Sequence, residues 1–211
     1  MKKLLLSIVI TSIALVTSAQ SFEGVIEFKK QTPTDTIQYI YYVKNDKIRL
    51  DEVGSKSKKV QGSFLLDLTN NTIVSLSHER KLYIEQASSP AEPVQGKVEV
   101  NKTNATKTIL GEKCSEYVVK NNEQKTQVTY WLASGKYDFF LKMLKLMNRK
   151  DKPSVYFQQI KNIEGMFPFL SSQINLETGK EEVKMEVTKV EKKSIPKSMF
   201  EIPKDYIKFQ K

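Results

Sequence analysis

Hydrophobic and polar residues alternate with a period of two along much of this chain. In the stretch 22–29, Phe22, Ile26 and Phe28 alternate with charged or small residues. A period of two places successive side chains on opposite faces, which is typical of a half-buried β-strand. Comparable alternating, aromatic or β-branched stretches lie at 36–44, 47–53, 63–68, 73–77, 81–86, 98–110, 113–120, 124–133, 169–176 and 181–192. The pattern therefore predicts about eleven strands.

Most of these stretches are separated by short polar turns, such as 45–46, 69–72 and 177–180. Connections of this length are too short for a crossover helix, so the strands are expected to pair as an antiparallel meander. The segment 87–96 contains Pro90, Pro93 and Gly96, and we expect it to be a surface loop within the same domain.

The hydrophobic period changes in the segment 137–150. Phe140, Met143, Leu144 and Met147 follow the spacing of one helix face, and lysines occupy the other positions. The segment is therefore expected to be a basic amphipathic helix. A second helix is expected from Pro153, where proline suits the first turn, to a glycine at 165.

Together these segments predict a mainly β fold. We expect a single large curved antiparallel sheet of about eleven strands, a half-barrel, with two or so helices covering the concave face. A tight β-sandwich is the alternative, but it gives less reason for helices inserted in a long meander. The domain is expected to span residues 20–211.

The first nineteen residues have the order of a secretory signal peptide. A basic head at Lys2 and Lys3 precedes an apolar run over 4–16, and small residues follow up to Ala19. The apolar run is shorter than the roughly 20 residues that a membrane-spanning helix needs. We therefore predict a signal peptide at 1–19, cleavage after Ala19, and a protein that is periplasmic or secreted.

Charge and composition narrow the possible partners. The chain carries 34 Lys and Arg against 24 Asp and Glu, a formal net charge of +10. A net positive charge of this size suits a nucleic-acid partner. However, an exported protein seldom meets nucleic acid, and the lysines are dispersed along the chain, so no nucleic-acid partner is predicted. The charge indicates either a solvated basic surface or attraction to an anionic membrane surface.

Candidate catalytic chemistry is sparse. The single Cys and single His exclude an internal disulfide and the common Cys/His zinc sites, and no cofactor or metal is expected. His78, in a polar turn, is expected to be solvated, and Cys114, in an alternating strand, to be a packing residue. Spacing alone leaves a Cys114–His78 dyad open. We predict that the protein is not an enzyme.

The predicted helix over the concave sheet offers a binding hypothesis. Large, adaptable apolar side chains on the helix could close a groove for a lipid or acyl chain. The candidate ligand-binding residues are Tyr39, Tyr41, Trp131, Phe139, Phe140, Met143 and Met147. The alternative is an ordinary packed helix in a structural or interaction module of the cell envelope, with side chains filling the same space and no small-molecule ligand.

Several stretches, in this order, resemble a family of uncharacterised secreted bacterial proteins that is grouped as a domain of unknown function. They are 22–26, 47–49, the Gly-x-x-Cys-x-x-Tyr stretch within 109–117, 130–133, 165–168 and 199–206. That family is similar in architecture to the periplasmic lipoprotein carriers LolA and LolB, half-barrels with a helical lid that hold acyl chains. The resemblance implies a lipid, an acyl chain or a lipoprotein as partner, and it implies no catalytic residues.

Overall fold

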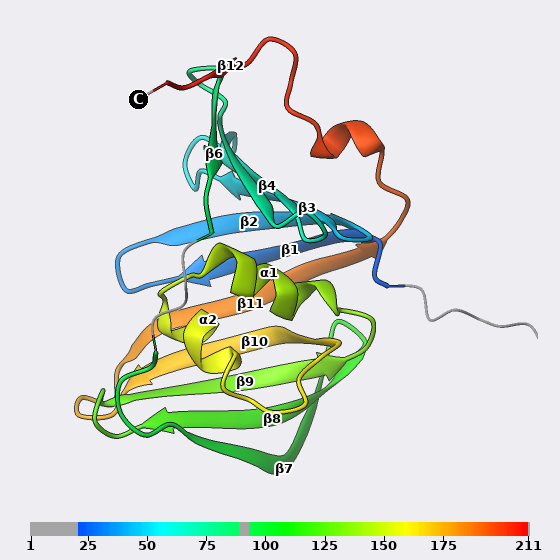
Figure 1. The fold of residues 1–211 in the computed structure, drawn as a ribbon. Helices are drawn as coiled ribbons and strands as arrows, with labels where there is room; N and C mark the ends of the chain where they lie inside the picture. The colour runs from blue at the N-terminus through cyan, green and yellow to red at the C-terminus, as the bar shows by residue number, and fades with distance from the viewer. Residues whose placement is uncertain (1–20, 89–92, 211) are drawn as a thin grey trace, which may run out of the picture.

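The described chain forms one open sheet of twelve strands. A computed structural model describes residues 21–88 and 93–210, so the predicted signal peptide lies outside the described residues. The strand order is β12-β6-β5-β4-β3-β2-β1-β11-β10-β9-β8-β7 (Figure 1). All neighbouring pairs are antiparallel except β12 with β6.

Two meanders make up this sheet apart from β12, and short turns join their strands except between β9 and β10. The first contains β1 (Gly24–Gln31), β2 (Thr36–Lys44), β3 (Lys47–Val53), β4 (Val60–Asp67), β5 (Thr72–Ser77) and β6 (Leu82–Gln86). The second contains β7 (Glu99–Ile109), β8 (Glu112–Asn121), β9 (Thr126–Ser134), β10 (Met166–Asn175) and β11 (Glu181–Lys192). They join where β1 pairs with β11, so residues near the two ends of the chain form the middle of the sheet.

Two helices lie between β9 and β10 and cover one face of the sheet (Figure 1). They are α1 (Phe139–Met147) and α2 (Lys152–Phe157). The predicted fold class, one large curved antiparallel sheet with two helices over one face, is confirmed. The second helix is shorter than predicted: it ends at Phe157, and the N–H groups of Gln159 and Ile160 then bond to carbonyls three residues back, in tight turns.

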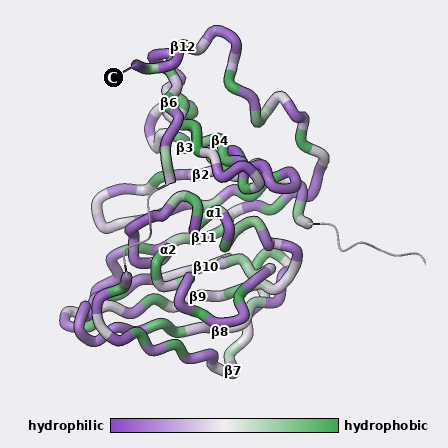
Figure 2. The backbone as a smooth tube through the Cα atoms, viewed as in Figure 1, coloured by the Kyte–Doolittle hydropathy of each residue, from purple (hydrophilic) through white to green (hydrophobic). Residues whose placement is uncertain are grey.

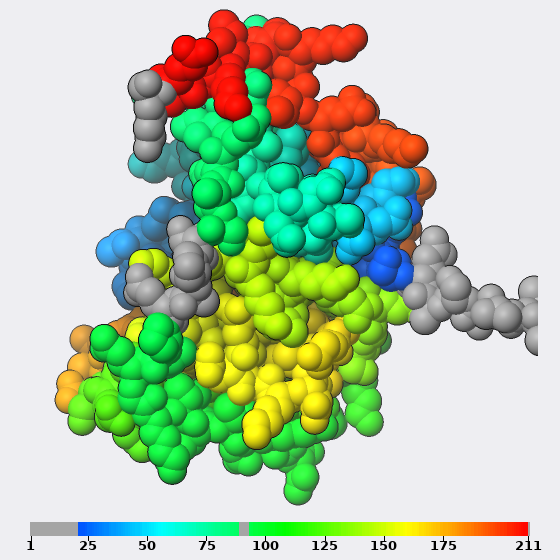
Figure 3. All heavy atoms as spheres, viewed as in Figure 1, coloured from blue at the N-terminus to red at the C-terminus, as the bar shows by residue number. Residues whose placement is uncertain are grey.

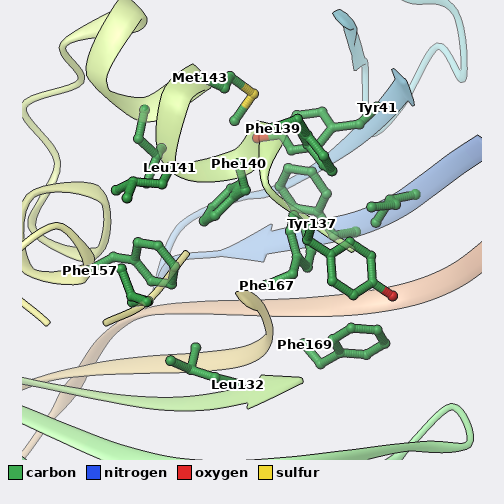
Figure 4. Packing of buried hydrophobic residues seen from close by; sticks show 14 of the residues in the cluster. Tyr41, Leu132, Tyr137, Phe139, Phe140, Leu141, Met143, Phe157, Phe167 and Phe169 are labelled. Carbon is green, nitrogen blue, oxygen red and sulfur yellow. The ribbon is translucent and has the colours of Figure 1, made fainter. Parts of the chain in front are cut away.

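A single hydrophobic core lies between the helices and the sheet. Hydrophobic and hydrophilic residues alternate along the strands that the helices cover (Figure 2). Phe140, Met143 and Leu144 of α1 are buried. In close view Phe140 and Met143 point toward aromatic side chains of the sheet (Figure 4). The half-buried period-two pattern of the sequence thus becomes one apolar layer under the helices.

The C-terminal segment crosses back to the first meander. It contains a single 3-10 turn, η1 (Lys197–Phe200), and then a two-residue strand, β12 (Ile207–Lys208), which sequence analysis did not predict. The segment lies over strands β3 to β6 at one end of the molecule (Figure 3). Among the described residues, no helix has the length and apolar character to cross a bilayer.

Candidate functional site

The space between α1 and the sheet is lined by aromatic rings. Phe140 of α1 has its ring centroid 4.6 Å from that of Phe167 and 5.0 Å from that of Phe157. On the sheet side, Tyr41 of β2 meets Phe28 of β1 edge-on, at 4.8 Å. Such edge-to-face pairs favour a defined geometry beyond their area burial.

Six of the seven predicted ligand-binding residues lie in this region. Tyr39, Tyr41, Phe139, Phe140 and Met143 are buried in the core, and Met147 is half-buried against it.

Trp131 is the exception. It alternates with the buried Tyr130 and Leu132 along β9, and its ring lies 4.4 Å from Lys107 Nζ in a cation–π contact on the other face of the strand. Trp131 is half-buried against the core cluster, as Met147 is, but it does not face the layer under α1.

Little empty space remains under α1. A narrow apolar cavity of about 20 Å³, here called the lid cavity, opens between α1 and the sheet. Its lining residues are Phe28, Tyr41, Phe140, Phe167, Pro168, Met185, Glu186 and Val187. The volume is on the scale of a single water molecule, which needs about 10–15 Å³, so α1 side chains occupy most of the space in this state.

The two helices are attached to the sheet differently. The Tyr130 hydroxyl of β9 donates a buried 2.7 Å hydrogen bond to the Pro153 carbonyl in α2. The Tyr156 hydroxyl of α2 donates to Gln124 Oε1 at 2.9 Å. These bonds fix α2 on the strand beneath it.

By contrast, α1 is held mainly by apolar contacts. Its described polar links are an exposed 3.5 Å ion pair between Lys142 and Asp46 and a 3.0 Å bond from Ser88 Oγ to the Leu146 carbonyl. Exposed ion pairs contribute little stability. We call α1 the lid, because it is the helix with the fewer fixed polar attachments.

A polar link joins the two helices. Arg149 Nε lies 2.9 Å from Asp151 Oδ2, and the Asp151 side chain caps α2 by accepting from the Ser154 backbone N–H. Burial raises the pKa of Asp151, but the Arg149 charge and these hydrogen bonds outweigh it, so the pKa is lowered. Burial raises the pKa of the nearby Tyr39 hydroxyl and, more strongly, that of Tyr41. The link anchors the C-terminal end of the lid beside β2.

A second and larger cavity lies at the other end of the lid, where the chain leaves β9 to begin α1. This root cavity measures about 640 Å³. Its lining residues are Ser21, Phe22, Glu23, Glu112, Ser134, Gly135, Lys136, Tyr137, Lys192, Lys193 and Ser194. Sequence analysis missed this site, because the residues come from the ends of four strands that only the fold brings together.

His78 is not a solvated turn residue, and that prediction is wrong. Its Nε2 lies 2.6 Å from Ser63 Oγ and its Nδ1 lies 2.6 Å from the Tyr206 hydroxyl. Ser63 donates to Asp51 Oδ1 at 2.5 Å, so Nε2–H donates to Ser63 and Nδ1 accepts from Tyr206. Asp51, Ser63, His78 and Tyr206 thus form one hydrogen-bonded cluster, and Tyr206 comes from the C-terminal segment, which is distant in sequence.

The cluster does not have the connectivity of a serine nucleophile site. In such a site the carboxylate orients the histidine, whereas here Asp51 binds Ser63 directly and Ser63 is 1% exposed. Burial and the Arg49 charge lower the pKa of His78, while Asp51 opposes them. The arrangement serves to hold the C-terminal segment on the sheet.

Cys114 is fully buried, as predicted for a packing residue. Burial, with a contribution from Glu112, raises its pKa to about 11, so the reactive thiolate is disfavoured. Seven strands separate β8, which carries Cys114, from β5, which precedes His78, so the two form no dyad. In the part of the chain that the structure describes, no group of His, Cys, Asp and Glu side chains could hold a metal ion.

Comparison with known proteins places the chain in a family and a fold. The family described as "Domain of unknown function (DUF4412)" matches residues 22–206, which confirms the predicted resemblance. No curated protein matches the sequence.

Among solved structures, an uncharacterised conserved protein from Thermus thermophilus is 8% identical, with a TM-score of 0.51 over 90% of this chain and 91% of that one. This likeness shows a shared fold. PNGF-II is 13% identical with a TM-score of 0.46 over 89% of this chain, which spans only 30% of PNGF-II. The LolA superfamily protein NE2245 from Nitrosomonas europaea is 12% identical, with a TM-score of 0.36 over 90% of this chain and 93% of that one.

Proposed function

The chain belongs to the DUF4412 family, and we propose that it is an exported, non-catalytic envelope protein that binds a lipid acyl chain beneath the lid. The observation that carries this proposal is the lid cavity, whose walls are almost entirely apolar and belong to both the lid and the sheet. Export rests on the signal peptide predicted for residues 1–19.

The attachments of the helices support an opening movement of the lid. The polar bonds of Tyr130 and Tyr156 hold α2 in place, whereas α1 depends on contacts that an apolar ligand could replace. Asn148 ends α1 in a left-handed backbone conformation, and Gly135 lies shortly before the start of the helix. A movement about these two positions would uncover the aromatic layer while the sheet and α2 stay in place.

Replacing the contacts between α1 and the sheet by contacts with a ligand changes the free energy little. Burial of an apolar side chain such as Phe140, Met143 or Leu144 contributes about 2 kcal/mol, so displacing three costs about 6 kcal/mol. Ten buried methylenes of an acyl chain contribute about 8 kcal/mol. A ligand can therefore offset the cost of opening, and without one the lid closes on the sheet.

The second candidate function is an interaction module of the envelope with no small-molecule ligand. One observation favours it: α1 side chains fill the space under the lid, and Met143 has no exposed surface. In this account the lid is a permanent part of the core. Both accounts fit the same closed state, so ligand binding itself must distinguish them.

The test is binding of a neutral apolar dye, N-phenyl-1-naphthylamine, to the mature chain. We expect saturable binding at micromolar concentration, with competition by hexadecanol. Met185→Asp places a charge beside the lid cavity and should weaken binding at least tenfold, because an unpaired charge is costly in an apolar site. The matched control Met185→Leu should keep it. If the wild type binds neither compound, the interaction-module account replaces this one.

A further inference from the structure

The root cavity is bordered by a hydroxyl group without a partner. Tyr137 is only 3% exposed as a residue, but its hydroxyl is not a fully buried atom: it has no hydrogen bond within the described residues and opens onto the cavity. In close view the hydroxyl points away from Phe139 and Phe167, while the ring packs with Phe167 at 5.4 Å (Figure 4). A hydroxyl that opens onto the cavity from a buried ring is available to donate to a ligand group that enters the cavity.

The charges around this hydroxyl are mostly positive. Glu23 is neutralised by Lys44 at 2.7 Å, and Lys193 pairs with Glu191 at 3.1 Å. Lys136 and Lys192 line the cavity and form no ion pair among the described residues.

The remaining negative charge is that of Glu112, which helps to raise the pKa of Tyr137 to about 12, after the larger effect of burial. Tyr137 therefore stays a hydrogen-bond donor at neutral pH. Two ammonium groups and one hydroxyl donor suit a carboxylate or phosphate group.

A row of packed aromatic rings connects the root cavity with the lid cavity. Phe22 and Tyr137 line the first, with ring centroids 5.3 Å apart, and Phe28 lines the second. Phe139 lies between them, 6.2 Å from Phe22 and 6.1 Å from Phe167. From Phe22 to Phe28, which lies in β1, the six residue-to-residue steps of extended chain span about 20 Å. One leaflet of a bilayer core is about 15 Å thick, so the row has the length of a lipid tail.

We propose that the root cavity holds the anionic headgroup of an amphiphile whose tail lies under the lid. This inference deepens the proposed function, because it names the ligand as a long-chain amphiphile with a carboxylate or phosphate head. Lys136, Lys192 and the Tyr137 hydroxyl bind the head, and Glu112 opposes it. The headgroup contacts the segment that leads into the lid, so head binding and lid opening occur at adjoining positions.

The test compares palmitate with hexadecanol, which share a chain length and differ in charge, by displacement of N-phenyl-1-naphthylamine. We expect the wild type to bind palmitate at least tenfold more tightly, as charge-assisted hydrogen bonds imply. Lys136→Met with Lys192→Met should abolish that preference and leave hexadecanol binding unchanged. The double control Lys161→Met with Lys180→Met, at exposed sites outside the cavity lining, should retain it.

Two further variants sharpen the result. Tyr137→Phe should reduce the preference for palmitate several-fold, and Glu112→Gln should increase it, because one removes a donor and the other removes a like charge. Hexadecyl phosphate in place of palmitate distinguishes a phosphate head from a carboxylate head.

Equal binding of palmitate and hexadecanol by the wild type, or a preference that survives in the Lys136 and Lys192 variant, overturns the headgroup site and leaves the proposed function standing. Binding of neither compound overturns the proposed function itself.

Discussion

The Tyr130 hydroxyl donates a buried 2.7 Å hydrogen bond to the main-chain carbonyl of Pro153, and this bond ties α2 to β9. The lid has no buried polar bond of this kind among its described contacts. The difference is why the proposed function treats α2 as a fixed support and α1 as the element that a ligand would displace.

Tyr130→Phe should therefore lower the free energy of unfolding by about 1 kcal/mol, the usual net value of a hydrogen bond lost without a change in shape. Urea denaturation measures the effect. Tyr117→Phe is the matched control, because Tyr117 is also a buried tyrosine of the sheet and its hydroxyl has no described hydrogen bond. Equal losses in the two variants would contradict the anchoring role of Tyr130.

Gly165 supports the root of the lid. Its φ is +72°, its carbonyl accepts from the Gly135 N–H at 3.0 Å, and an added Cβ would lie 2.7 Å from the Gly135 carbonyl oxygen. Gly165→Ala should cost about 3 kcal/mol, since strain at positive φ and a backbone clash combine.

Gly179→Ala is the control for this prediction. Its φ is +68° and an added Cβ would meet nothing within 4 Å, so only the backbone strain of about 1 kcal/mol applies. Thermal unfolding of both variants gives the comparison. A Gly179 variant as unstable as the Gly165 variant would show that the contact with Gly135 is unimportant.

The cluster around His78 should make attachment of the C-terminal segment depend on pH. Burial and Arg49 hold the His78 pKa below the value of about 6.5 for a free histidine. The native state therefore binds the proton less well than the unfolded state does. The stabilisation is present above about pH 6.5 and is lost as pH falls through the folded-state pKa.

Amide hydrogen exchange of residues 206–209 at pH 7.5 and pH 5 tests this, after correction for intrinsic rates. We expect weaker protection at pH 5 in the wild type and a smaller pH effect in His78→Gln. Identical pH effects in the two proteins would assign the change to other groups.

Cys114 should be inert in the folded protein. It has no exposed surface, and its raised pKa leaves little thiolate at pH 8. Labelling with 5,5′-dithiobis(2-nitrobenzoate) should be slow and should accelerate on unfolding. Cys114→Ser should cost about 1–3 kcal/mol, because a hydroxyl is harder to bury than a thiol. Fast labelling of the native protein would contradict burial of this side chain.

Much of the fold could be predicted because each strand carries its own signal. The alternation in 36–44 and 181–192 coincides with β2 and β11, and the change of period at 137–150 marks α1. The two-residue strand β12 carries no such signal, because its partner β6 determines it. The predicted second helix was too long, since hydrophobic spacing does not show that tight turns replace the helical hydrogen bonds after Phe157.

The candidate site could be predicted only in part. Helical spacing identified Phe140 and Met143, which do line the layer under the lid. The lysines of the root cavity lie at distant positions in sequence, and only the pairing of β1 with β11 brings Lys192 toward the start of the lid. The partners of His78 were missed for the same reason, because Tyr206 comes from the far end of the chain.

The most direct test of the central claim is native mass spectrometry of the mature protein, purified under mild conditions from the envelope fraction of the cells that produce it. The account predicts a population whose mass exceeds that of the polypeptide by one long-chain anionic lipid, which collisional activation releases. The protein should also bind added palmitate after delipidation. A single mass equal to that of the polypeptide, with no binding of added palmitate or hexadecanol, would contradict the claim that an acyl chain lies beneath the lid.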